Sequence, residues 1–187
     1  MKFTILLLVY AHILIFANPS FPMSDENTPI PIDDVKGEMK KFSFSQKPVL
    51  VENLMVLTDD NLESNLMNYG HNLILINFWA TWCGPCVEEM PSLDKLQSLF
   101  ETKHLKIITV ATGRNNQRKI VDFFKEYKIL NLENFGDPKG TLAMKMGVLG
   151  LPTSIIISPE GHEIARLIGP INWMQADVVK FFRTLTL

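Results

Sequence analysis

The apolar run Leu73–Trp79 (LILINFW) constrains the fold of this chain more than any other segment. Asn77 alone interrupts it, so both faces of the segment are expected to be buried. A strand buried on both faces is typical of the centre of a sheet that helices cover on its two sides. The run therefore predicts a central β-strand in an α/β protein.

The segments around this run alternate between strand and helix patterns. Residues 48–57 are apolar and β-branched and predict a strand, whereas residues 58–69 predict a short helix capped by Thr58 and ended by Gly70. Further strands are predicted at residues 105–111, 153–157 and 163–168, and amphipathic helices after Cys83 and at residues 120–127 and 174–185. Alternation that ends in a hairpin and a helix predicts an α/β fold with a central mixed sheet flanked by helices.

Composition excludes several classes of protein. Hydrophobic residues make up 47% of the 187 residues and charged residues 20%, which is typical of a globular chain and not of a disordered one. The net charge is -2 and no block of Lys and Arg stands out, so no nucleic-acid partner is expected. Residues 35–187 are predicted to form one domain with its own core.

The first 17 residues resemble a targeting segment. Lys2 is followed by residues 3–17, which are apolar except for two positions, as in a secretory signal. As a helix this run reaches roughly 22 Å, against about 30 Å for a bilayer core. Ala17 could precede a cleavage point, although the bulky Ile15 stands where a small residue is preferred. A cleaved signal and a retained membrane anchor therefore both stay open, and both export the rest of the chain across the cytoplasmic membrane, to the periplasm.

Residues 18–34 have the composition of a linker. They contain four prolines and four acidic residues and no basic residue, so they are expected to stay extended and solvated. Such a segment would hold the domain away from a membrane surface.

The only two cysteines, Cys83 and Cys86, form a C-x-x-C motif at a predicted strand-to-helix junction. A disulfide scaffold would spread its cysteines along the chain, and a structural zinc site would need four ligands, so no metal is expected. Near a βαβ pattern the motif indicates redox chemistry. Helix N-termini favour a thiolate, so Cys83 is the expected nucleophile, and Cys86 is expected to resolve the mixed disulfide. Gly84 permits close approach of a partner, and Pro85 is tolerated in a first helical turn.

Residues 77–86 (NFWATWCGPC) resemble the active-site segment of the thioredoxin superfamily. Residues 87–96, which include Pro91 at the position of the family's helix-kinking proline, resemble the TlpA-like branch of exported thioredoxins (TlpA, ResA and CcmG). Residues 147–154 resemble its cis-proline loop, and residues 163–170 with Trp173 resemble TlpA proper. The resemblance implies a thioredoxin fold with an N-terminal strand extension and an inserted βα element. It also implies a thiol–disulfide oxidoreductase that needs no cofactor beyond the Cys83–Cys86 disulfide.

The resemblance also implies roles for other residues. Pro152 is expected to be cis and to face Cys83, where it forms a substrate-docking edge with Leu151 and Thr153. Of the tryptophans that flank the motif, we expect Trp79 in the core and Trp82 at the border of the docking surface.

Asn77 departs from the pattern of cytoplasmic thioredoxins, which carry a buried Asp at this position. An amide cannot take a proton, so water or Glu89 must accept the proton of Cys86. For Glu89 itself the favoured interpretation is simpler, namely an acid in the first turns of a helix, where it interacts with the helix dipole.

We therefore hypothesise that the chain is a reductase of exported thiol and disulfide proteins. A membrane electron donor would re-reduce its cysteine pair after each cycle. The resemblance implies targets in cytochrome c maturation or in assembly of the copper site of cytochrome oxidase, and Gly84-Pro85 supports a reducing pair. A disulfide oxidase or isomerase and a redox-inert binding module remain alternatives. Copper handling is another, since nine Met and exported thiols suit copper, although Sco-like chaperones use C-x-x-x-C. Peroxidase activity is disfavoured because Ala80 stands where peroxiredoxins place Thr.

Overall fold

The computed structural model describes residues 35–70 and 72–186. The predicted targeting segment at residues 1–17 and the predicted linker at residues 18–34 lie outside the described residues, so these two expectations stay predictions. Across the described ranges, no helix combines the length and the apolar character that a membrane span requires.

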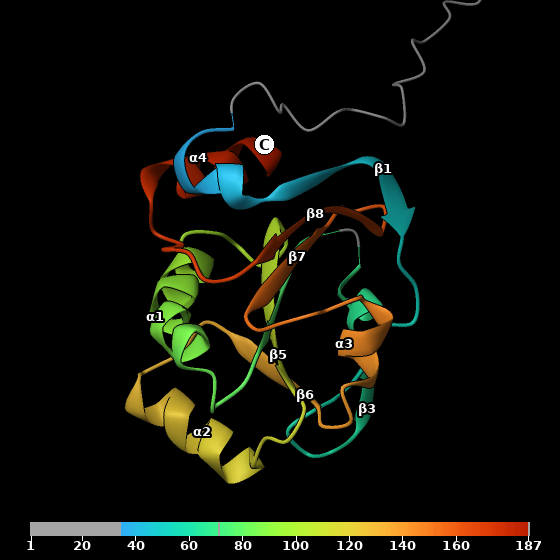
Figure 1. Ribbon diagram of the computed structural model, residues 1–187, viewed down its shortest axis with the longest axis vertical. Helices are drawn as coiled ribbons and strands as arrows, with labels where there is room; N and C mark the ends of the chain where they lie inside the picture. Colours follow the sequence, from blue (N-terminus) through green and yellow to red (C-terminus); the bar gives the residue numbers. More distant parts are fainter. Residues whose placement is uncertain (1–34, 71, 187) are drawn as a thin grey trace, which may run out of the picture.

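One mixed sheet runs through the domain in the strand order β1-β8-β7-β4-β5-β6-β2-β3 (Figure 1). Its central strand β4 (Leu73–Trp79) is buried at every position, as predicted. It pairs in parallel with β5 (Leu105–Thr112) and antiparallel with β7 (Thr153–Ile157), which forms a hairpin with β8 (His162–Ile168). The predicted central mixed sheet is therefore confirmed.

Helices cover both faces of this sheet. The helices α1 (Gly84–Ser98), α2 (Gln117–Glu126) and α4 (Ala176–Leu185) pack with the 3-10 helix η2 (Gly37–Lys41) into one core layer, and α3 (Thr141–Lys145) packs into the other. Figure 1 shows α1 and α2 on one side of the strands and α3 on the other. Alternate side chains of β4 pack into the two core layers. Leu75 and Trp79 face α1, whereas Ile76 and Phe78 face α3. Asn77 shares the parity of Leu75 and therefore faces α1.

The predicted single strand at residues 48–57 is wrong. β1 (Ser43–Leu50) pairs with β8 at one edge of the sheet, and β2 (Met55–Leu57) pairs with β6 (Glu133–Asp137) near the other. Between the two strands, Asn53 adopts a φ of 53° and Leu54 is fully buried. Val49, Leu50 and Met55 are exposed, so the apolar run is neither one continuous strand nor a uniformly buried segment.

The predicted helix at residues 58–69 is also wrong. The Thr58 N–H donates to the carbonyl of Leu62 at 2.9 Å, and the hydroxyl of Thr58 accepts from the Leu62 N–H at 3.1 Å. This turn leads into β3 (Glu63–Asn65), which pairs with β2, and then into the 3-10 helix η3 (Leu66–Tyr69). Acidic and amide side chains at residues 59–61 favour a turn over a helix interior. Gly70, with a φ of 74°, ends η3, so a glycine stop is confirmed there.

Candidate active site

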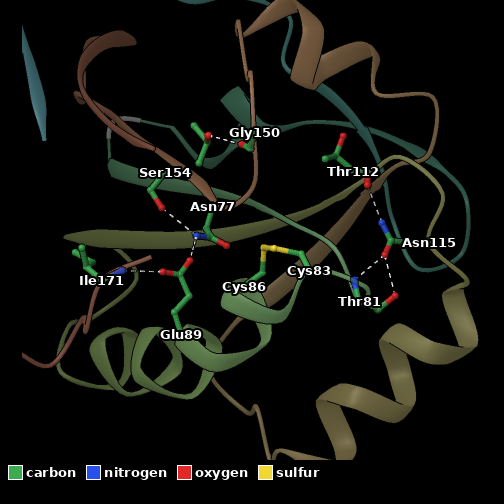
Figure 2. The surroundings of a disulfide bond; sticks show 11 residues. Asn77, Thr81, Cys83, Cys86, Glu89, Thr112, Asn115, Gly150, Ser154 and Ile171 are labelled. Atoms are coloured by element: carbon green, nitrogen blue, oxygen red, sulfur yellow. Dashed lines mark hydrogen bonds between the residues drawn. A yellow bond between two sulfur atoms is a disulfide. The ribbon is translucent and has the colours of Figure 1, made fainter. Parts of the chain in front are cut away.

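Cys83 and Cys86 lie at the N-terminus of α1, at the end of the sheet where β4 finishes (Figure 2). Cys83 is the N-cap residue, and Cys86 follows one turn later with a Cα–Cα distance of 5.3 Å. The two sulfurs are joined as a disulfide. Cys83 is 7% exposed and Cys86 is fully buried, so Cys83 is the more accessible residue of the pair. This unequal burial agrees with the roles predicted for the two residues.

Backbone hydrogen bonds fix the short connection between the end of β4 and the start of α1. The Cys83 N–H donates to the carbonyl of Ala80 at 3.0 Å, and the Cys83 carbonyl accepts the N–H of Val87 at 3.1 Å. Pro85 stands in the first helical turn, where its missing N–H leaves no helical bond unmade. Helix α1 therefore begins directly after Cys83, the residue that carries the attacking sulfur.

A neighbouring loop holds the segment just before Cys83. The side-chain oxygen of Asn115 accepts the backbone N–H of Thr81 at 2.9 Å and its hydroxyl at 3.1 Å (Figure 2). The amide of Asn115 in turn donates to the Thr112 carbonyl at 2.8 Å. Asn115 is a residue of the site that the sequence analysis did not identify, since nothing local links it to a loop that lies far away along the chain.

The Leu151–Pro152 peptide bond is cis, as the resemblance implied. Thr153 opens β7 and pairs with Phe78 near the end of β4, so the Pro152 loop and the cysteines lie at the same end of the sheet. The hydroxyl of Thr153 donates to the Gly150 carbonyl at 2.7 Å and stabilises the loop. Docking of a substrate backbone along Leu151 stays a prediction.

Asn77 and Glu89 form a buried polar contact on one side of the disulfide (Figure 2). The Asn77 amide nitrogen donates to Glu89 Oε1 at 2.8 Å and to the hydroxyl of Ser154 at 3.0 Å (Figure 2). Ser154 is the cross-strand neighbour of Asn77 in the pairing of β4 with β7. The sequence analysis missed Ser154, because the register that makes the two residues neighbours is a tertiary property.

The favoured interpretation of Glu89 as an acid that interacts with the helix dipole is wrong. Its side chain is buried, at 4% exposed, and its second oxygen accepts the backbone N–H of Ile171 at 3.2 Å. Burial raises the pKa of Glu89 to about 7, although the hydrogen bonds from Asn77 and from Ile171 oppose the rise. Helical spacing places Glu89 three residues after Cys86, on the same face of α1. A buried carboxyl whose pKa is raised to about 7 therefore lies on the same face of α1 as the resolving cysteine.

The remaining predicted residues divide between core and surface. Trp79 is fully buried, donates to Asn134 Oδ1 at 3.0 Å and packs against Phe123, which confirms its core position. Trp82 is 64% exposed, as expected for a residue at the border of a docking surface. Pro91 lies inside α1. In the part of the chain that the structure describes, no three His, Cys, Asp or Glu side chains are grouped so as to hold a metal ion.

The sequence matches the model of the AhpC/TSA family over residues 35–164. Among curated relatives, Sporulation thiol-disulfide oxidoreductase A of Bacillus subtilis is 27% identical, over 68% of this chain and 77% of the relative. Thiol-disulfide oxidoreductase ResA of Bacillus thuringiensis is 30% identical, and the match spans 61% of this chain and 65% of the relative.

A solved structure shares the fold. The secreted thiol-disulfide isomerase of Corynebacterium glutamicum superposes with a TM-score of 0.68 at 16% identity, over 81% of this chain and 95% of that structure. The mixed sheet, the flanking helices and the position of the cysteine pair at a strand-to-helix junction match the predicted thioredoxin fold. The chain therefore belongs to the AhpC/TSA family and is a thioredoxin-like thiol–disulfide oxidoreductase.

Proposed function

We propose that this chain reduces disulfides in exported partner proteins. The observation that carries the proposal is the placement of the pair, with a reachable Cys83 at a helix N-terminus and a buried Cys86 one turn later. A helix N-terminus stabilises the thiolate that attacks a target disulfide, and burial protects the second thiol from external partners.

The cycle begins with the reduced pair. The Cys83 thiolate attacks one sulfur of the target disulfide, which forms a mixed disulfide and releases the other target sulfur as a thiolate. Cys86 then loses its proton and attacks Cys83, which releases the second target thiol and leaves the Cys83–Cys86 disulfide that the structure describes. A membrane electron donor must return two electrons to the pair for the next cycle.

Glu89 is the group proposed to receive the proton of Cys86. It lies on the same face of α1, it is buried, and its pKa of about 7 lets it alternate between charged and neutral forms near neutral pH. Asn77, which occupies the position of the acid in cytoplasmic thioredoxins, cannot take that proton.

Export and membrane attachment complete the proposal. Residues 3–17 carry the signal or anchor pattern, and the relative from Corynebacterium glutamicum is a secreted protein. Thiols of apocytochrome c, or cysteines of copper-handling proteins in oxidase assembly, are the proposed substrates of a pair held at that surface.

The reduction potential separates a reductase from an oxidase or isomerase. We expect the pair to equilibrate with dithiothreitol close to the potential of thioredoxin, about -270 mV, whereas strong disulfide oxidants lie near about -120 mV. A measured potential above about -150 mV would refute the reductase and favour the oxidase or isomerase.

Trapping identifies the partner. The Cys86→Ser variant retains the attacking Cys83 but cannot release a mixed disulfide, so partners should accumulate in a form that a reductant releases. The matched control is Cys83→Ser, which keeps the same number of thiols and should capture nothing. Equal capture by both variants would exclude the proposed order of attack.

A further inference from the structure

The Asn77 amide has all of its donors in use. Its nitrogen carries two hydrogens, and the structure gives that nitrogen two acceptors, Glu89 Oε1 at 2.8 Å and the Ser154 hydroxyl at 3.0 Å. In its ionised form Glu89 can only accept hydrogen bonds, and that form fixes which end of the amide faces it. The orientation of Asn77 is therefore set by its nitrogen, and the carbonyl oxygen must point the other way.

That carbonyl oxygen is buried and has no hydrogen-bond partner among the described residues. Figure 2 shows it directed toward the disulfide, on the side of Asn77 away from Glu89. A buried acceptor without a donor is unfavourable, and native structures keep few of them. The disulfide cannot relieve this because its sulfurs carry no hydrogen.

Reduction of the disulfide changes the chemical group that faces the Asn77 carbonyl oxygen. Two electrons and two protons convert the disulfide into a dithiol, from which the helix N-terminus favours loss of the Cys83 proton. Cys86, which is fully buried, keeps an S–H that needs an acceptor. We propose that Asn77 is a positioning residue whose carbonyl oxygen accepts the Cys86 thiol, so that it holds the reduced pair in place without taking a proton. This inference rests on the proposed cycle, in which Cys86 waits as a thiol until the mixed disulfide forms.

The hydrogen bond exists only in the reduced protein, so it shifts the redox equilibrium. Asn77→Leu removes the acceptor in the reduced state and removes an unsatisfied polar group in the oxidised state. Both effects make the disulfide harder to reduce. We expect the equilibrium constant for reduction by glutathione to fall about fivefold, the factor that one ordinary hydrogen bond supplies.

The S–H stretching band in the infrared spectrum tests the contact directly. Cys83→Ser leaves Cys86 as the only thiol of the chain, so its band can be assigned without ambiguity. We expect this band to be narrow and shifted to lower frequency in the folded protein relative to the urea-unfolded protein. The shift should disappear in Cys83→Ser/Asn77→Leu.

The matched control is Cys83→Ser/Ser154→Ala, which removes one partner of the Asn77 nitrogen but leaves Glu89 to orient the amide. Its band should keep the shift. An unshifted band in folded Cys83→Ser, or a shift that survives Asn77→Leu, would overturn the inference. If the Leu variant does not fold, an unshifted band in folded Cys83→Ser still overturns the inference. Partner trapping by Cys86→Ser tests the proposed reductase function without involving Asn77. Failure of the proposed function and failure of the Asn77 inference can therefore be distinguished.

Discussion

Replacing Glu89 with Gln should remove a specific pH dependence of stability. The carboxyl of Glu89 is buried at the contact between α1 and the segment after β8, where it accepts hydrogen bonds from Asn77 and from Ile171. Burial raises its pKa from the ordinary value of 4.5 to about 7. Gln keeps the size of the side chain and an acceptor oxygen but has no proton to exchange.

The sign follows from proton linkage. A pKa that is higher in the folded protein means that the folded state binds the proton more tightly than the unfolded state. The resulting stabilisation is complete below pH 4.5 and is lost as the pH rises through about 7. The shift corresponds to about 3 kcal/mol of unfolding free energy across that window.

Urea unfolding of the oxidised protein between pH 4.5 and pH 8 measures this difference, because the disulfide keeps the cysteines from titrating. All other ionisable groups are present in both proteins, so their contributions cancel when the Glu89→Gln curve is subtracted. Glu88→Gln is the matched control, since Glu88 is the adjacent but exposed acid and should leave the pH dependence unchanged. An identical pH dependence in wild type and Glu89→Gln, or a midpoint close to 4.5, would refute the reasoning.

Three further substitutions test other parts of the structure. Asp137→Ala should lower the unfolding free energy by about 1–3 kcal/mol in urea, because the buried carboxylate accepts the N–H groups of Leu142 and Ala143; a smaller loss would show that water replaces it. Phe182→Ala should remove about 3–5 kcal/mol, measured in the same way, since the ring is fully buried; near-neutral stability would contradict its place in the core. Trp82→Ala should change stability by less than about 0.5 kcal/mol but raise KM for a partner disulfide, and an unchanged KM would exclude a docking role.

The local pattern predicted the centre of the fold better than its N-terminal part. The run Leu73–Trp79 is β4, and the helix after Cys83 is α1, because both are long, strongly patterned segments. Residues 48–57 were misjudged because an apolar composition records neither which residues are buried, here Leu54 and Val56, nor the strand to which each residue pairs. The chain there leaves one edge of the sheet and reaches the other, which no local pattern records.

The candidate site shows the same division. The cysteines, Trp79 and the cis-proline could be named from motifs that are short in sequence. The surroundings of Glu89 could not be predicted in this way. The local sequence of an acid in an early helical turn is the same whether its side chain is exposed to solvent or bound to a buried amide. Here the N–H of Ile171, which is 82 positions away along the chain, donates a hydrogen bond to the buried carboxyl.

The sequence by itself determined the chemistry of this protein, since two cysteines at a strand-to-helix junction suffice to specify a redox pair. Only the tertiary structure decided the surroundings of Glu89 and Asn77. The register of β4 against β7 brings Ser154 to Asn77, and the packing of the segment after β8 against α1 buries Glu89. Proton affinity depends on the polarity of the surroundings, and those surroundings come from segments that are distant in the chain.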